Sequence, residues 1–126
     1  MHMDLINLSE DFAKYIFHKS QFSSLNQRVK YSVFMPPSKK RLSVFRISGL
    51  SVQEVWKIGE TIGVQRALSL LARADIKASA VIDIGLEIDA DNMPPRHANI
   101  VGWPDEDSEI KLRALELAEK AQLHLK

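Results

Sequence analysis

The chain has 126 residues, of which 45% are hydrophobic and 26% are charged, and its formal net charge is +1. This composition is typical of a single globular domain over residues 1–126, and the lack of a long apolar window or a basic leader predicts a soluble, cytoplasmic protein without membrane contact. The chain contains no cysteine, which excludes disulfide bonds, thiolate nucleophiles and cysteine-bound metal sites.

The first elements are predicted to be a helix and a loop. The Met-His-Met start is consistent with vector-derived residues 1–3. Ser9 suits the cap of a helix that ends near Lys19, because acids fill its first turn and lysines lie toward its end. Residues 21–27 (QFSSLNQ) are polar and predict a loop.

An antiparallel hairpin is predicted over residues 28–48. Residues 28–35 alternate in polarity with the period of a strand. Pro36 and Pro37 cannot continue this strand, because each lacks a backbone N–H donor. Residues 42–47 are again rich in β-forming residues, so the basic segment between the two strands becomes the hairpin tip.

A capping box predicts the next helix. Ser51 and Glu54 have the spacing of this motif, and Gly63 suits a left-handed stop. Residues 64–73 are able to extend the helix, but the glycine before them and their alternating leucines favour a strand.

A short helix, a strand and a loop follow. Asp75 suits the cap of the short helix and Gly85 its end. Residues 86–88 (LEI) predict a short strand, and residues 89–96 (DADNMPPR) predict a loop.

The C-terminal part is predicted to hold a strand and the longest helix. Residues 96–103 predict the strand, and the helix begins at Asp107 or Ser108 and ends near Gln122. Residues 123–126 either add a strand or fray. Together these elements predict an α+β fold: a single two-layer domain whose mixed or antiparallel sheet carries about four helices, mainly on one face.

The charges are unevenly distributed along the chain. Residues 1–11 hold three acids and no Lys or Arg, residues 12–53 hold eight bases and no acid, and residues 54–126 hold thirteen acids and nine bases. Bases neutralise phosphates and exposed aromatic rings stack on nucleobases, so the hairpin predicts a contact surface for nucleic acid or an acidic protein partner. The residues assigned to this surface are Arg28, Lys30, Phe34, Lys39, Lys40, Arg41 and Arg46.

A second interpretation of the hairpin remains open. Aromatic residues usually lie in a core, and bases can face acids elsewhere in the same chain. Strand alternation places Tyr31 with Val29 and Val33, as in a core, whereas Phe34 shares the other face with basic residues.

A second candidate site surrounds His97. The predicted short helix and loop can bring Arg73 and Asp75 toward Arg96, His97 and Asn99. A neutral imidazole acts as a base or a donor near pH 7, and arginine binds anions. We therefore assign His97 and Arg73 to catalysis and Arg96 and Asn99 to binding. The alternative, which the sequence favours, is that His97 and Asn99 lie on an ordinary strand.

The stretch ASAVIDIGLEIDADNMPPRHANI holds a helix ending in Gly-Leu, a loop and a strand with His, and it resembles the RNA 2′-phosphotransferase and ADP-ribosyltransferase superfamily. The resemblance implies that the strand helps to bind NAD or a phosphate, with His97 as the strand histidine and Arg73 at the position of a second histidine. The His-Gly-Thr element of the superfamily is replaced here by ARAD, and no clear catalytic Glu follows.

More broadly, the segments RVKYSVFMPP, RLSVFRISGLS and PPRHANIVGWP resemble a family of small, uncharacterised bacterial proteins. That likeness implies no particular activity.

The segment EIDADN offers a metal site as a further alternative. Asp89 and Asp91 carry hard oxygen ligands that suit Mg²⁺ or Ca²⁺. The spacing lacks the Gly and the distal Glu of an EF-hand loop, so a surface loop is the favoured interpretation. The sequence also lacks a phosphate-binding Gly-rich loop, a nucleophile elbow and a His-Glu-x-x-His motif, and we expect no metal or cofactor.

The sequence therefore favours a binding domain over an enzyme. We expect it to be part of a bacterial multi-protein system, and a homo-oligomer stays open. The enzyme alternative is a small transferase for a nucleotide-like substrate, NAD or a phosphorylated nucleotide, in which Arg73 and Arg96 bind the anion and His97 moves a proton. A third alternative is a structural subunit that binds no ligand.

Overall fold

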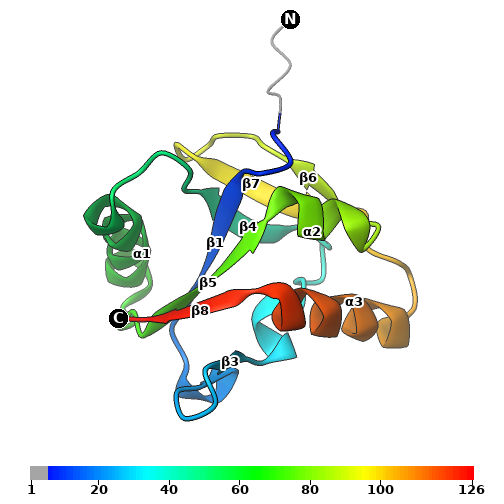
Figure 1. Ribbon diagram of the computed structural model, residues 1–126, viewed down its shortest axis with the longest axis horizontal. Helices are drawn as coiled ribbons and strands as arrows, with labels where there is room; N and C mark the ends of the chain where they lie inside the picture. The colour runs from blue at the N-terminus through cyan, green and yellow to red at the C-terminus, as the bar shows by residue number, and fades with distance from the viewer. Residues whose placement is uncertain (1–5) are drawn as a thin grey trace, which may run out of the picture.

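A six-stranded antiparallel sheet organises residues 6–126, the part of the chain that the computed structural model describes (Figure 1). The strand order is β6–β7–β4–β1–β5–β8. These strands are β1 (Asp11–Ile16), β4 (Leu42–Arg46), β5 (Ala72–Lys77), β6 (Glu87–Asp89), β7 (His97–Val101) and β8 (Gln122–Leu125). A separate two-stranded ribbon pairs β2 (Phe22–Ser23) with β3 (Arg28–Val29). The vector assignment of residues 1–3 lies outside the described residues.

Three α-helices and two 3₁₀ helices join the strands within the described range. They are α1 (Val52–Arg66), α2 (Ala78–Asp83), α3 (Asp107–Lys120), η1 (Lys19–Gln21) and η2 (Tyr31–Phe34). The chain is therefore a small α+β domain, as predicted.

Helices cover both faces of the sheet. In β1, Phe12 and Ile16 belong to the larger hydrophobic core, which also contains residues of α2, α3 and η2. Ala13 and Tyr15 belong to a smaller core with Val55 of α1. Because successive strand residues point to opposite faces, α1 lies on one face and α2 and α3 on the other. The predicted arrangement of about four helices in two layers is therefore not confirmed.

The predicted first helix is wrong, because its core residues form β1. Asp11–Ile16 pairs with both β4 and β5. Phe12 and Ile16 have the spacing of a helical face, but Ala13 and Tyr15 between them are buried as well. A strand that is buried on both faces lacks simple alternation and so resembles a buried helix in sequence.

The predicted hairpin over residues 28–48 is also wrong. Only Arg28–Val29 of its first arm is a strand, and Tyr31–Phe34 forms η2. The 3₁₀ turn places the consecutive residues Val33 and Phe34 together in the larger core, which a strand could not do. The second arm is a strand, β4, but it pairs with β1 and β7.

The capping box of α1 is confirmed, and its predicted end is not. The Ser51 hydroxyl accepts from the Glu54 amide, and the Glu54 carboxylate accepts from the Ser51 amide. The helix continues past Gly63 to Arg66, so the strand predicted over residues 64–73 is wrong for most of its length. Gly63 serves close packing, because a Cβ there would lie 2.7 Å from the Leu68 carbonyl oxygen.

The later elements agree more closely with the sequence predictions. The loop before β7, the strand β7, the helix α3 and the terminal strand β8 all form. The short helix α2 begins only at Ala78, so Asp75 lies inside β5 and does not cap it. Gly85, with a φ of +92°, provides the left-handed residue that follows α2.

The packing of α1 on β1 gives a test of the fold. A Cβ added at Gly59 would lie 2.7 Å from Tyr15 Cε1 and 2.8 Å from Leu70 Cδ2. Gly59→Ala should lower the free energy of unfolding by about 1–3 kcal/mol, because overpacking outweighs the gain of about 1 kcal/mol in helix propensity. Urea unfolding measures this change. Gln65→Ala, on the exposed side of the same helix, is the control and should leave the free energy of unfolding unchanged or raise it. An equal rise in both variants would contradict the close packing of Gly59 against Tyr15 and Leu70.

Candidate functional site

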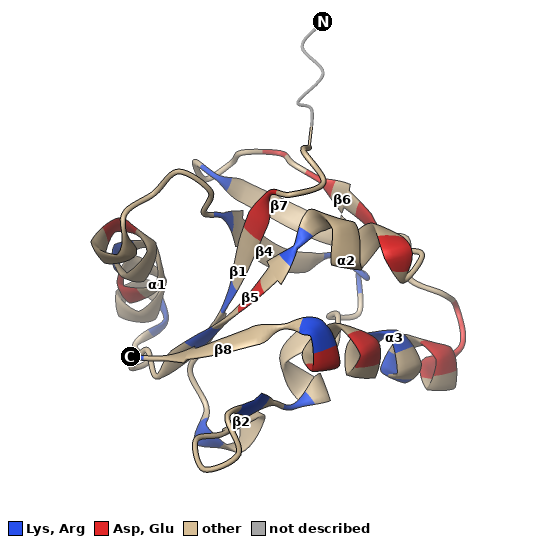
Figure 2. Cartoon of the chain, viewed as in Figure 1, with Lys and Arg blue, Asp and Glu red and all other residues tan. Residues whose placement is uncertain are grey.

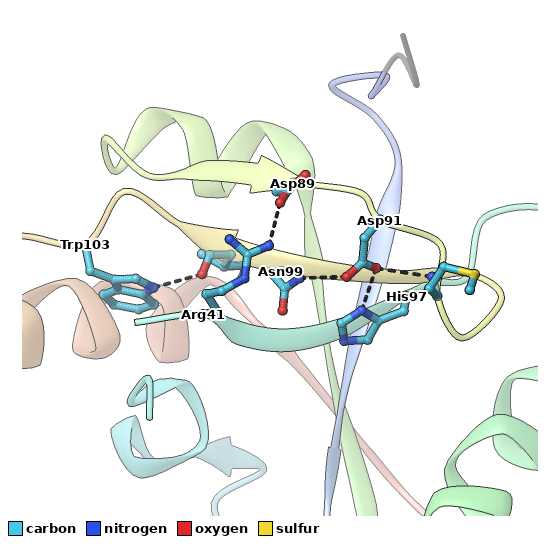
Figure 3. A network of polar contacts seen from close by, with 8 residues as sticks. Arg41, Asp89, Asp91, His97, Asn99 and Trp103 are labelled. Atoms are coloured by element: carbon cyan, nitrogen blue, oxygen red, sulfur yellow. Dashed lines mark hydrogen bonds and ion pairs between the residues drawn. The ribbon is translucent and has the colours of Figure 1, made fainter. Parts of the chain in front are cut away.

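His97 lies at the centre of a polar network on the α1 side of the sheet (Figure 3). In the β4–β7 register, His97 is paired with Phe45 and Asn99 with Ser43. Paired residues of an antiparallel ladder share a face, so these four side chains lie together. The His97 ring packs edge-on against the Phe45 ring, with 5.4 Å between the ring centroids.

Both ring nitrogens of His97 have a partner. Nδ1 lies 2.7 Å from Oδ1 of Asp91, and Nε2 lies 2.7 Å from Oγ of Ser43. Asn99 donates to the other carboxylate oxygen of Asp91 at 3.2 Å, and the Met93 amide donates to Oδ1 at 3.3 Å. Figure 3 shows these donors converging on the Asp91 carboxylate. The loop before β7 is therefore fastened to the sheet through Asp91.

The electrostatics of Asp91 fix the direction of these hydrogen bonds. Partial desolvation opposes ionisation of Asp91, but hydrogen bonds from His97, Met93 and Asn99 outweigh it, so the pKa of Asp91 lies below its ordinary value. An ionised carboxylate only accepts hydrogen bonds, so Nδ1 of His97 is the donor. A neutral His97 then presents Nε2 as an acceptor for the Ser43 hydroxyl.

Lys14 lies beside β4, the strand that carries Ser43. Its ammonium donates to the backbone carbonyl of Ser43 at 3.0 Å. Desolvation, aided by the nearby charge of Arg66, lowers the pKa of Lys14 from 10.5 to about 8. A cavity of about 20 Å³ adjoins these groups and is lined by Ser43, Lys14, Arg66 and the aromatic rings of Tyr15, Phe17 and Phe45, together with Ala13 and Ile62.

Arg73 does not join this network. In the sheet order, β4 and β1 separate β5 from β7, which places Arg73 roughly 14 Å from His97 at ordinary strand spacing. Tyr15 and Phe45 fill the space between them, because Tyr15 is paired with Arg73 and Phe45 with His97. The predicted meeting of Arg73 and His97 is therefore wrong.

Arg73 instead belongs to a buried ion pair under α1. Its Nε lies 3.1 Å from Oδ1 of Asp75, and its guanidinium lies 4.5 Å from the centre of the Trp56 ring. Asp75 also faces His124, with 3.3 Å between Nε2 and Oδ2. Desolvation raises the pKa of Asp75 despite these cations. These contacts fasten α1 and β8 to the sheet, and the buried Arg73 is not accessible to a ligand.

Arg96 directly precedes β7, and its guanidinium contacts the end of β4. It adopts a left-handed backbone with a φ of +71°, and its Nη1 donates to the Arg46 carbonyl at 3.3 Å. An open pocket of about 500 Å³ adjoins Arg96 and Arg46. Arg46 is already paired with Glu10 there, at 2.6 Å from Nε to Oε2.

The predicted basic surface divides into paired and unpaired residues. Lys40 pairs with Asp105 at 3.3 Å, Arg41 pairs with Asp89, and Arg46 pairs with Glu10. The rings of Phe34 and Phe45 are buried and are not available for stacking. Lys39 is exposed in the loop before β4.

Arg28 and Lys30 remain exposed and open onto a groove. The groove has a volume of about 630 Å³ and lies between the β2–β3 ribbon, η2 and the second half of α3. We call it the basic groove; it is lined by Ser20, Ser23, Asn26, Arg28, Val29, Lys30, Tyr31, Ser32, Leu115, Ala118 and Glu119. The Lys111 ammonium lies 4.8 Å from the centre of the Tyr31 ring. Figure 2 shows Lys and Arg gathered on this ribbon, below α3 and β8.

The sequence identified His97 and Asn99 but missed their partners. One feature of the sequence points to Ser43: strand alternation places it on the same face as Phe45. The sequence suggests Asp91 only as a metal ligand, whereas in the structure it binds His97, and Asp89 binds Arg41. Over residues 6–126, His, Asp and Glu side chains form no group of three or more suited to a metal ion.

Comparisons with protein-family models, curated proteins and solved structures give no match for this chain. The resemblances to a transferase superfamily and to a bacterial family therefore stay predictions. Among the described residues, no helix has the length and apolar character needed to cross a membrane.

The lowered pKa of Lys14 predicts a pH dependence of stability. Between pH 8 and 10.5 the unfolded chain holds this proton more tightly than the folded chain, so the free energy of unfolding should rise with pH, by up to about 1.4 kcal/mol per pH unit. Lys14→Met removes this contribution. Urea unfolding of both proteins from pH 7 to 9.5 should show the wild type gaining about 1–2 kcal/mol relative to the variant. If the difference in the free energy of unfolding between wild type and Lys14→Met stays constant with pH, the desolvation of Lys14 is contradicted.

Proposed function

We propose that this protein is a binding module that takes a segment of single-stranded nucleic acid in the basic groove. The observation that carries the proposal is the placement of Arg28 and Lys30. Both are exposed, neither forms an ion pair with another described residue, and both line one groove of about 630 Å³. By contrast, three other bases of the predicted surface have carboxylate partners: Lys40, Arg41 and Arg46.

The groove offers the groups that such a ligand needs. A guanidinium and an ammonium neutralise phosphates, and the hydroxyls of Ser20 and Ser23 and the amide of Asn26 can bind phosphate or sugar oxygens. Tyr31 is half-buried and supplies an aromatic ring at the groove. This proposal includes the cytoplasmic, bacterial setting expected from the sequence.

Three other interpretations are less well supported. An acidic protein partner would use the two cations but not the hydroxyls and the ring beside them. The transferase alternative required Arg73 next to His97, and the two strands between them separate these residues. A structural subunit without a ligand would leave the unpaired cations of the groove without a role.

A binding experiment with matched variants tests the proposal. Arg28→Ala/Lys30→Ala should weaken binding of a labelled single-stranded RNA of about ten nucleotides, measured by fluorescence anisotropy. The log–log dependence of affinity on salt should become shallower by roughly 1.4, because each lost phosphate contact contributes roughly 0.7. The control, Lys39→Ala/Lys57→Ala, removes the same charge from exposed positions outside the groove and should bind like the wild type.

The outcomes separate the alternatives. Equal loss of affinity in both double variants would reject the groove and indicate a dependence on net charge alone. An acidic peptide that binds with the affinity and salt dependence of RNA would assign the groove to an acidic protein instead.

A further inference from the structure

We propose that Ser43 is an activated nucleophile that accepts the acyl group of a small ester. Its hydroxyl lies 2.7 Å from Nε2 of His97, whose Nδ1 lies 2.7 Å from Oδ1 of Asp91. A hydroxyl, an imidazole and a carboxylate joined in this order form the arrangement by which enzymes raise the reactivity of serine. This activity is independent of the basic groove, which lies on the opposite side of the sheet among η2 and α3.

The three groups are held firmly. Ser43 and His97 lie on neighbouring strands, so the β4–β7 register sets their distance. Asp91 lies in a loop, but its carboxylate also accepts hydrogen bonds from the Met93 amide and the Asn99 side chain. The base is therefore oriented by a carboxylate that is itself fixed at both oxygens.

The charges suit proton transfer from Ser43. The lowered pKa of Asp91 keeps its carboxylate ionised at neutral pH. An ionised Asp91 holds the proton of His97 on Nδ1, leaves Nε2 free to take the proton of Ser43, and stabilises the imidazolium that then forms.

The cavity beside Ser43 supplies positive charge and limits the substrate. Its volume of about 20 Å³ is room for about one water molecule. Lys14 and Arg66 line it, and two cations at this place can stabilise the oxyanion that forms on the ester carbonyl. The small volume excludes a long acyl chain.

Water is the only reactant that the reaction needs besides the ester. The Oγ of Ser43 attacks the ester carbonyl carbon while its proton passes to Nε2 of His97. The bond from carbon to the leaving alcohol oxygen breaks, and the alcohol leaves with that proton. Water then attacks the acyl-serine and gives a proton to His97, and the acid leaves as the proton returns to Oγ of Ser43.

A thiol probe tests the activation of Ser43 without relying on turnover. The chain has no cysteine, so Ser43→Cys introduces a single thiol. We expect its alkylation by iodoacetamide, followed by mass spectrometry across pH, to show a midpoint at least about one unit below the ordinary value of about 8.5. Ser69→Cys, at an exposed position, is the control and should show the ordinary midpoint.

The double variant Ser43→Cys/His97→Gln assigns the effect to His97. Its midpoint should return to that of Ser69→Cys if the imidazole lowers the thiol pKa. A Ser43→Cys midpoint equal to or above that of Ser69→Cys would overturn the proposal. Circular dichroism of each variant confirms that the comparison is made between folded proteins.

Acyl transfer itself is tested on the wild-type protein. A small fluorophosphonate and p-nitrophenyl acetate should each modify Ser43, as seen by peptide mass spectrometry, and Ser43→Ala should lose the adduct while Ser69→Ala keeps it. An adduct only at other residues, or equal labelling in His97→Gln, would overturn the proposal. Ser43→Ala should still bind RNA like the wild type, so a failure of this proposal is distinguishable from a failure of the basic groove.

Discussion

β1 lies between β4 and β5, and its side chains enter both hydrophobic cores of the domain. Phe12 and Ile16 pack under α2 and α3, while Ala13 and Tyr15 pack under α1. A strand in this place must be apolar on both faces, because a single misplaced polar group there would be desolvated without a partner. Lys14, the charged side chain in the middle of β1, avoids this cost because its ammonium donates to the Ser43 carbonyl.

The position of α1 follows from β1 and decides where polar residues can gather. Gly59 lets the helix approach the Tyr15 ring closely, and the buried Arg73 lies against Trp56 of the same helix. Beyond Phe45, on the same face of the sheet, β4 and β7 carry the polar side chains of Ser43, His97 and Asn99. The fold thereby places a histidine with two fixed partners beside a hydrophobic cluster, which is the setting in which an imidazole can act on a neighbouring hydroxyl.

On the other face, the larger core is closed by η2 and α3. Phe34 of η2 is buried in that core, and the chain just before it carries Arg28 and Lys30 at the surface. The basic groove therefore depends on the same packing that buries the aromatic residues expected to stack on bases. Of the aromatic residues on the predicted hairpin, Tyr31 alone lines the groove.

Local signals in the sequence predicted local structure well and long-range pairing poorly. The capping box of α1 and the amphipathic pattern of α3 depend on neighbouring residues, and both helices form. The identity of β1 and the partners of β4 depend on contacts across the sheet, so the local pattern indicates a helix in place of β1 and half of a hairpin in place of β4. The site shows the same division: His97 and Asn99 stood out by type, whereas Ser43 and Asp91 become partners only through the β4–β7 register and the fold of the loop.

We place nucleic-acid binding in the basic groove and not on the polar face around His97. A backbone amide NMR titration with single-stranded RNA tests it most directly, because it reports on both regions at once. We expect shift changes concentrated at Arg28, Lys30, Tyr31 and Leu115, with Ser43 and His97 unchanged. Shift changes concentrated on β4 and β7, or in the loop that carries Lys39, without changes in the basic groove would contradict this assignment.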